Sequence, residues 1–364
     1  MKTNDRSIEI KILRTVLCVL LAIVLIVGGY FAYVLIAYHR IDDNTDLAVE
    51  HGGSGVVPTG EDLTAMTYNI GFAAYTADYG FFLDGGNESR AASADSVNSV
   101  MGSIAELAYG YDPDLVIFEE VDYDSTRSYH IDEREPLLSK FAGYDSVFAI
   151  NYDSPYLFYP ILCPHGASRA GILTFTRYDI KSSVRRSLPI ENTLMKLLDL
   201  DRCYSVTRLD TDNGRELVIY STHMSAYSSD GSIATEQLKM LTEDMQKEYE
   251  AGNYVICGAD FNKDVLGDSS VYFGIDGKEF TWAQPFPTDL LDGKPLTLVR
   301  PLDENDPIPS CRNPDGPYNE NQFVLTIDSF IVSDNVTVTS AEVVDTGFAY
   351  SDHNPVVITF TLNK

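Results

Sequence analysis

The sequence predicts an α/β protein with two packed mixed β-sheets flanked by helices, preceded by one N-terminal transmembrane helix. About ten short apolar runs alternate with only two long amphipathic stretches, so strands outnumber helices. Many of these strands are separated by loops of hairpin length, whereas a doubly wound parallel sheet would need a helix after nearly every strand. A separate run of roughly 21 residues near the N-terminus carries no charge.

This uncharged run, residues 16–36, is the first element, and it is long enough to cross a bilayer as a helix. Basic residues precede it and acidic residues follow it: Lys2, Arg6, Lys11 and Arg14 before, and Asp42, Asp43, Asp46 and Glu50 after. The positive-inside bias predicts a single-pass protein of the plasma membrane, with a cytoplasmic N-terminus and an extracellular remainder. A cleaved signal peptide is the alternative, but the run is long for one and no small-x-small site closes it.

Four parts are therefore expected along the chain. Residues 1–14 form a cytoplasmic N-terminus, 15–38 the transmembrane helix, 39–62 a flexible linker and 63–364 one large domain. The linker is inferred from its polarity and from the run Gly52-Gly53-Ser54-Gly55.

Within the large domain, apolar runs and helical periodicity predict the individual elements. Strands are expected over 63–70, 114–121, 144–150, 171–178, 203–209, 217–224, 254–261, 325–332, 336–344 and 355–362. Helices are expected over 93–109 and 232–251.

Charge and cysteine usage narrow the functional classes. The chain has 26 Lys+Arg against 54 Asp+Glu, a formal net charge of −28. This balance disfavours a large basic surface that tracks nucleic-acid phosphates, so nucleic acid is a possible but not a favoured partner. Cys163, Cys203 and Cys311 have no metal-ligand spacing, which makes a zinc site improbable and leaves one disulfide among them possible.

Polar residues recur at the ends of the predicted strands. They are Asn69, Glu119, Glu120, His223, Asp260, Asn262, Asp328, Asp352 and His353. Oxygen donors and imidazoles without a thiolate suit Mg²⁺, Mn²⁺ or Ca²⁺ better than zinc. Asp328 lies inside an apolar strand, where an unpaired carboxylate costs several kcal/mol, so a histidine partner is expected. Hydrolysis of a phosphoester needs such a set of residues.

Six short motifs resemble those of the endonuclease/exonuclease/phosphatase superfamily, and they occur in its order over nearly all of residues 63–362. They are Thr67-Tyr68-Asn69, Glu119-Glu120-Val121, Ser221-Thr222-His223, Gly258-Ala259-Asp260-Phe261-Asn262, Ile327-Asp328 and Ser351-Asp352-His353. The resemblance implies a four-layer α/β sandwich and a divalent-metal-dependent phosphoesterase. Two positions depart from the superfamily: Glu119 replaces the usual glutamine, and Ala259 stands before Asp260 where glycine is usual.

Roles follow from the resemblance, residue by residue. Glu120 is similar to the principal metal ligand, with Asn69 and Asp352 near the metal. His353, held by Asp328, is similar to the base or phosphate-contacting histidine. Asp260 and Asn262 are implied to orient the attacking water and the phosphate, and His223 to stabilise charge on the phosphoryl oxygens. Activation of the water is implied to be shared by Asp260 and His353. Glu119 is expected at the surface rather than at the metal.

The substrate is less constrained by the sequence. Residues 152–169 supply Tyr156, Phe158 and Tyr159 with several prolines, and only Arg169 is basic. Such a loop favours a small or lipid phosphoester over a duplex phosphate backbone. Arg90, Arg169 and His165 are either phosphate contacts or structural residues. An extracellular endonuclease is the alternative enzyme, and a catalytically silent adhesion or scaffold domain is the alternative outside enzymes.

Overall fold

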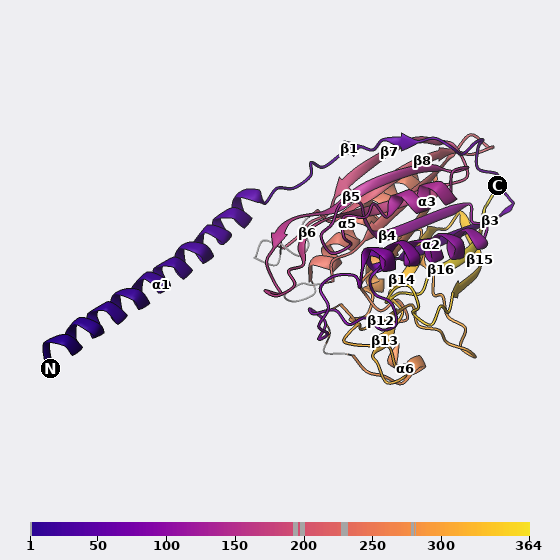
Figure 1. Cartoon of the computed structure of the whole chain (residues 1–364). Helices are drawn as coiled ribbons and strands as arrows, with labels where there is room; N and C mark the ends of the chain where they lie inside the picture. Colours follow the sequence, from indigo (N-terminus) through magenta and orange to yellow (C-terminus); the bar gives the residue numbers. More distant parts are fainter. Residues whose placement is uncertain (1, 192–195, 197–200, 227–231, 278–279, 281) are drawn as a thin grey trace. The chain divides into compact units, whose positions relative to one another are not determined.

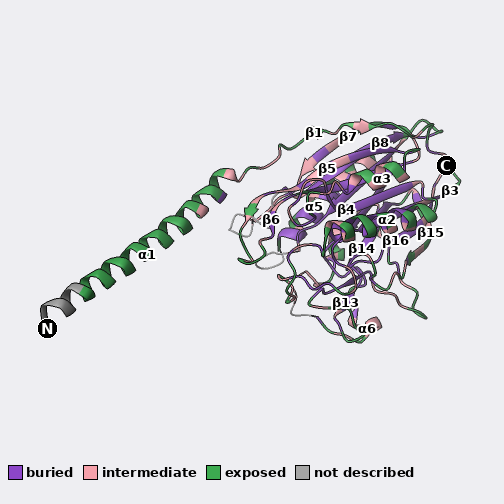
Figure 2. Cartoon of the chain, viewed as in Figure 1, coloured by how far each residue is buried: buried purple, intermediate pink, exposed green. Residues whose placement is uncertain are grey.

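The computed structural model describes residues 2–191, 196, 201–226, 232–277, 280 and 282–364. It divides into two units, Met1–Arg40 and Ile41–Lys364. The first contains helix α1 (Lys2–Ala37), whose segment Ile8–Ala37 is long and apolar enough to cross a membrane. The candidate transmembrane helix is thus present as a helix, and most of its apolar side chains are exposed, whereas Val34 is buried (Figure 2).

The second unit contains two seven-stranded sheets (Figure 1). The first sheet has the order β1 (Thr45–Asp46), β7 (Ile180–Ser187), β8 (Cys203–Asp210), β9 (Glu216–His223), β10 (Tyr254–Asp260), β14 (Asp328–Ser333) and β11 (Leu296–Leu298). The second sheet has the order β15 (Val336–Val343), β16 (Val356–Leu362), β3 (Asp62–Asn69), β4 (Leu115–Asp122), β6 (Gly166–Thr176), β5 (Asp145–Leu157) and β2 (Val49–Glu50). Both are mixed, since β9 and β10, and likewise β3 and β4, run parallel.

Smaller elements complete the unit. They are α2 (Ala94–Gly110), α3 (Arg134–Lys140), α5 (Ser232–Glu250), α6 (Ser270–Phe273), two 3₁₀ helices (Gly71–Ala73 and Thr288–Leu291) and the two-stranded pair β12 (Cys311–Arg312) and β13 (Val324–Leu325).

Alternating side chains of the central strands build three apolar cores. Leu63 and Ala65 of β3 pack with Ile256 of β10 between the sheets, whereas Met66 and Tyr68 pack outward beneath α2. In the first sheet, alternate residues of β9 and β10 pack outward against α5. Because each central strand is buried on both faces, its sequence is a continuous apolar run. The layers are helix, sheet, sheet and helix, which confirms the predicted four-layer α/β sandwich.

The predicted long strands and both predicted helices are present, most of them within a few residues of the expected bounds. The strands expected over 144–150 and 171–178 are longer toward their hairpin, since β5 continues to Leu157 and β6 begins at Gly166. Strand β7 escaped prediction because it carries Lys181, Arg185 and Arg186, so its apolar pattern is broken. The buried guanidinium of Arg185 donates from Nε to the carbonyl oxygen of Ile150, at 2.9 Å. The five cysteines are free thiols, so the disulfide considered above is not formed.

The segment predicted as a flexible linker differs in the structure. Strand β1 pairs with the edge of the first sheet and β2 with the edge of the second. The backbone N–H groups of Gly52 and Gly53 donate to Asp145 Oδ1, at 2.9 and 3.0 Å. The glycines allow a close backbone approach, and each sheet offers an edge whose backbone groups lack partners without this segment. Residues 41–62 therefore belong to the folded unit.

Candidate active site

The side chains that point between the two sheets are apolar in the middle of the strands and polar at one end of them. Asp260 at the end of β10 pairs in register with His223 of β9 and with Asp328 of β14. Asn69 at the end of β3 faces them from the second sheet, and its Nδ2 donates to Asp260 Oδ2 at 3.1 Å. Four residues predicted from the sequence thus meet where the two sheets open.

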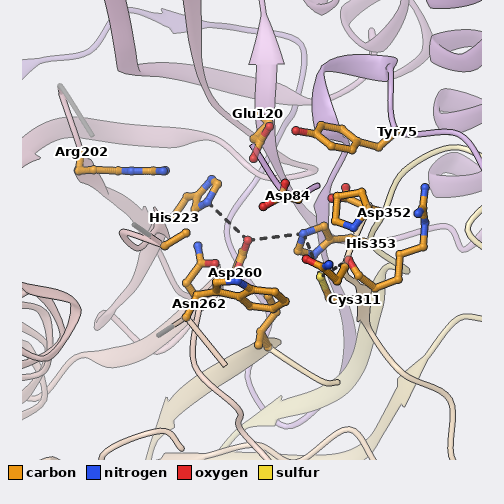
Figure 3. Close-up of a pocket in the computed structure, with 16 residues that line it drawn as sticks. Tyr75, Asp84, Glu120, Arg202, His223, Asp260, Asn262, Cys311, Asp352 and His353 are labelled. Atoms are coloured by element: carbon orange, nitrogen blue, oxygen red, sulfur yellow. Dashed lines mark hydrogen bonds and ion pairs between the residues drawn. The ribbon is translucent and has the colours of Figure 1, made fainter. Parts of the chain in front are cut away.

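Asp260 is the centre of this group (Figure 3). Its Oδ2 lies 3.4 Å from His223 Nε2 and 3.7 Å from His353 Nε2. Its Oδ1 accepts a hydrogen bond from the backbone N–H of Asn262, at 2.8 Å. Asn262 has a positive φ of 48°, a conformation that asparagine tolerates better than most residues. The Asn262 side chain in turn donates to the carbonyl oxygen of Met224, at 2.9 Å, which holds the loop after β10.

His353 and Asp328 form the pair expected from the sequence. His353 Nδ1 lies 2.8 and 3.0 Å from the two carboxylate oxygens of Asp328. Ser310 Oγ donates to Asp328 Oδ2 at 2.6 Å, so both oxygens of this buried carboxylate have partners. The pair fixes the ring of His353 with Nε2 toward the pocket.

A β-bulge in β4 separates the two adjacent glutamates. Glu119 and Glu120 together stand opposite one residue of β6, and Glu120 has a positive φ of 56°. Glu119 points inward and accepts a hydrogen bond from Thr67 Oγ1, at 2.7 Å. The expectation that Glu119 lies at the surface is wrong: it is fully buried. Glu120 lines the pocket, and Asn69 Nδ2 donates to its Oε1 at 3.3 Å.

Asp352 lines the same pocket from the loop before β16. Ser351 Oγ holds this loop against the end of β3 by donating to the carbonyl oxygen of Asn69, at 2.8 Å. Gly71 allows the close approach: a Cβ there would lie 3.1 Å from Asp352 Oδ1 and 2.6 Å from the ring of Tyr75, and its φ is +51°. Figure 3 shows Glu120 and Asp352 around one opening, together with Asp84.

Several pocket residues were missed by sequence reasoning. They are Tyr75, Asp84, Arg202, Trp282, Cys311, Arg312 and Asn313. Most of them lie in loops or very short strands, where periodicity gives no signal. Cys311 is notable because its Sγ lies 3.6 Å from His353 Nε2.

The three tentative phosphate contacts have structural roles instead. Arg90 Nε donates to the carbonyl oxygen of Pro164 at 2.7 Å, and His165 Nδ1 lies 2.9 Å from that of Ser89. Arg169 pairs with Asp124, at 3.2 Å. None of the three is among the described residues that line the pocket.

The two histidines beside Asp260 differ in protonation. Burial lowers the pKa of His223 well below its usual range, and the Arg202 guanidinium lowers it further, so His223 is neutral at pH 7. Burial also acts to lower the pKa of His353, but the Asp328 carboxylate outweighs it and raises that pKa well above the usual range. His353 is therefore a cation and His223 is not.

Replacing Asp328 by asparagine should shift the pH dependence of activity. The carboxylate is what keeps His353 protonated, so its loss lowers the pKa of His353 and deprotonates the ring at a lower pH. As the pH rises, the activity of both chains should fall, and we expect the fall to begin at a lower pH in Asp328→Asn than in the parent chain. Profiles of kcat against pH for the two chains measure this; superimposable alkaline limbs would contradict it.

The donor set fits a hard divalent cation. Asp260, Asp328 and His353 place ligand atoms within 4.8 Å of one another. Both oxygens of Asp328 are already taken by His353 and Ser310, so this carboxylate is a poor ligand. Glu120 and Asp352 are better placed because both face the pocket. Burial, with Glu120 adding repulsion, raises the pKa of Asp352 to about 6, a cost that a bound cation would relieve.

Divalent metal should stabilise the fold more at pH 8 than at pH 5. Burial raises the pKa of Asp260 from 3.8 to about 7, so the metal-free fold holds a proton that the unfolded chain has lost. Metal-free stability therefore falls as the pH rises from about 4 to 7. At pH 8 both Asp260 and Asp352 are charged and can favour a cation. Melting temperatures with Mg²⁺ and with EDTA at both pH values test this, with NaCl of matched ionic strength as control; equal shifts at both pH values would contradict it.

A four-layer α/β sandwich with carboxylates, an amide and two histidines at the open end of its sheets defines a class of phosphoester hydrolase. The chain belongs to the Endonuclease/Exonuclease/phosphatase family, whose sequence model matches residues 66–353. This confirms the resemblance inferred from the six motifs. A search of curated protein sequences finds no match.

Solved structures share the fold at low sequence identity. An endonuclease/exonuclease/phosphatase from Beutenbergia cavernae is 20% identical, with a TM-score of 0.58 over 83% of this chain and 72% of that one. The human Nocturnin catalytic domain, with bound sulfate, is 19% identical, with a TM-score of 0.53 over 87% and 97%. ANGEL2, a 2',3'-cyclic phosphatase in complex with adenosine-2',3'-vanadate, is 16% identical, with a TM-score of 0.56 over 87% and 99%.

Proposed function

We propose that this chain is a membrane-anchored, outward-facing, divalent-metal-dependent phosphoesterase, a phosphodiesterase or phosphatase that acts on a small or lipid phosphoester. The carrying observation is that Asp260 lies between a neutral His223 and a cationic His353. A buried proton acceptor between a neutral and a charged donor suits hydrolysis, in which water loses a proton while charge grows on phosphoryl oxygens.

Each residue has one role in this proposal. Asp260 accepts the proton of the attacking water, which the amide of Asn262 helps to orient. His353 donates from Nε2 to a phosphoryl oxygen, and Asp328 keeps it charged and oriented. Neutral His223 donates a hydrogen bond to a second phosphoryl oxygen, and its buried Nδ1 has no protein partner among the residues that the structure describes.

The implied metal is Mg²⁺, or Mn²⁺ or Ca²⁺ in its place. Glu120 would hold it, with Asp352 in the same pocket. Asn69 is nearby, since its Nδ2 donates to Glu120 while its Oδ1 accepts from the backbone N–H of Gly71. When bound, such an ion supplies positive charge that neutralises the phosphoryl oxygens.

An extracellular endonuclease remains the second candidate. Trp282 and Arg202 both line the pocket; an indole can stack on a nucleotide base, and a guanidinium can bind a phosphate. The net charge of −28 argues against a long duplex contact. ANGEL2 and Nocturnin share the fold only, so they do not decide the substrate.

Hydrolysis by the full chain in detergent tests the proposal. The substrates are bis-p-nitrophenyl phosphate, sugar phosphates, sphingomyelin and plasmid DNA, each with Mg²⁺ or Mn²⁺ and with EDTA. Metal-dependent turnover of small or lipid phosphoesters supports it. Nicking of DNA alone would favour the endonuclease, and a folded chain inactive on every substrate would favour the silent adhesion or scaffold domain.

Protease treatment of intact cells should release the folded unit. The proposed topology places residues 1–14 in the cytoplasm and residues after about 38 outside, and it rests on the charges that flank α1. Immunoblots with tags at each terminus should show loss of the C-terminal tag and protection of the N-terminal one. A cytoplasmic protein is probed in parallel to confirm that the cells are sealed. Loss of the N-terminal tag with protection of the C-terminal one would reverse the topology, and protection of both tags would contradict an outward-facing domain.

A further inference from the structure

The hairpin between β5 and β6 ends in an exposed apolar tip, residues 155–164. These ten residues include no charged side chain. Five large apolar side chains of the tip are solvent-exposed: Tyr156, Phe158, Tyr159, Ile161 and Leu162. Leu162 is 100% exposed and Ile161 69%. Elsewhere in the described part of Ile41–Lys364, exposed large apolar residues occur singly or in twos, as Val271 does on α6. A concentrated patch of this kind marks an interaction surface.

The base of the tip is held in place by hydrogen bonds. Ser89 Oγ donates to the carbonyl oxygen of Cys163 at 2.6 Å, and Arg90 Nε to that of Pro164 at 2.7 Å. The ring of Tyr159 packs against Phe82, with centroids 5.6 Å apart. The apolar side chains are therefore presented outward on a fastened loop rather than folded back onto the domain.

The tip extends past the end of the sheet that bears the pocket. Strand β4 ends at Asp122, opposite Ala170 of β6. The segment after β4 follows β6 as far as Ala167, whose carbonyl oxygen accepts from the backbone N–H of Thr126, and the residues before Ala167 lie beyond it. The tip precedes β6 and projects with it. Contacts between rings also connect the tip with the pocket, from Tyr159 through Phe82 and Phe81 to Tyr75.

The chain enters the folded unit at the same end. The backbone N–H of Ile41 donates to Asp201 Oδ1 at 2.7 Å, and the next residue, Arg202, lines the pocket. Helix α1 ends at Ala37, so residues 38–40 alone connect it to Ile41. The four Cα–Cα steps from Ala37 to Ile41 span at most about 14 Å. If α1 crosses a bilayer, the entry point lies close to the bilayer surface.

We propose that the apolar tip inserts into the bilayer that α1 crosses, so that the pocket faces the membrane and takes a phosphoester carried on a lipid headgroup. Bulky aliphatic and aromatic side chains without charge suit the interface between lipid headgroups and acyl chains. The net charge of −28 makes electrostatic attraction to an anionic membrane unfavourable, so the contact is apolar. Of the properties proposed above, the insertion depends only on the membrane anchor, whereas the lipid substrate also depends on the proposed phosphoesterase activity.

Tryptophan fluorescence tests the insertion without reference to activity. Leu162→Trp is made in the full chain together with Trp282→Phe, since Trp282 is the one native tryptophan. The protein is reconstituted into phosphatidylcholine vesicles with or without brominated acyl chains. Val271→Trp is the matched control, because Val271 is also a branched apolar residue and is 73% exposed, but it lies on α6.

We expect brominated lipid to quench Leu162→Trp at least about twofold more than Val271→Trp. Equal quenching of both, or of neither, would overturn the insertion. A shielding of the Leu162→Trp indole from water that rises with the protein-to-lipid ratio, without quenching by brominated lipid, would mean that the tip contacts a second copy of the chain. This outcome would also overturn the insertion.

Activity tests the lipid substrate separately. Ile161→Glu with Leu162→Glu should lower hydrolysis of sphingomyelin in vesicles by about tenfold and leave turnover of soluble bis-p-nitrophenyl phosphate unchanged, whereas Val271→Glu changes neither. Equal loss on both substrates would overturn the membrane role. Turnover of the soluble diester by the parent chain with no lipid hydrolysis would overturn the lipid substrate and leave the phosphoesterase itself in place.

Discussion

Replacing His353 by alanine is expected to lower kcat on a small phosphodiester by about 10³-fold, the usual size of a general acid–base contribution. His353 lies 3.7 Å from Asp260, is kept cationic by Asp328 and presents Nε2 to the pocket. The variant loses both the donor to the phosphoryl oxygen and the positive charge. Steady-state kinetics at saturating metal measure the loss.

Stability has to be separated from catalysis in this variant. Without the imidazole, the buried Asp328 carboxylate keeps, among the described residues, only the hydrogen bond from Ser310 Oγ, and this loss should cost about 1–3 kcal/mol of unfolding free energy. His353→Gln is therefore made as well, because its amide can still donate to Asp328. His51→Ala is the matched control: His51 Nδ1 lies 3.0 Å from Asp145 Oδ2, in another histidine–aspartate pair that lies outside the pocket. A folded His353→Gln with full kcat would remove His353 from the mechanism.

Glu120→Gln is expected to reduce metal affinity by about 100-fold or more, since even residues that only support a ligand contribute 10–100-fold. Activity at sub-saturating Mg²⁺ should fall in proportion, and the pH 8 thermal shift should disappear at the same metal concentration. The strained φ of Glu120 directs a charged oxygen donor into the pocket, and glutamine is a weaker ligand for a hard cation. Isothermal titration with Mn²⁺ and metal-dependence curves measure the effect.

The neighbouring residue provides the control. Burial raises the pKa of Glu119 well above its usual range, which favours the neutral form over a charged metal ligand. Glu119→Gln retains the acceptor for Thr67 and introduces the residue usual in the superfamily. It should leave metal affinity and kcat within about twofold. Loss of metal binding in Glu119→Gln but not in Glu120→Gln would mean that the two roles are reversed.

The layers of the fold were predictable because short apolar runs outnumber helical stretches and many are separated by loops of hairpin length. Polar residues end the runs at Asn69 and at Asp260, and they were predicted to belong to one site. The Asp328–His353 pair followed from the cost of a lone carboxylate in an apolar strand, and the structure contains it.

Other features depend on contacts that periodicity does not encode. Glu119 was misplaced because the bulge in β4 turns two adjacent residues to different sides, and no pattern within β4 marks a bulge. The glycine-rich segment 52–55 indicated flexibility, but the edges of both sheets fix the chain around it. Trp282, Arg202 and Cys311 reach the pocket from segments whose course is set by tertiary packing.

The bridge made by Asn69 has a consequence for how the protein opens and closes in solution. Its amide joins strands whose residues are 191 positions apart, so the bridge can form only after most of the chain has been brought together. A ligand that requires this contact does not bind a partly unfolded form in which the two sheets have separated. Mg²⁺ should therefore slow amide hydrogen exchange in β3 and β10 together, through the global opening reaction, while the exchange of frayed edges such as β1 stays fast.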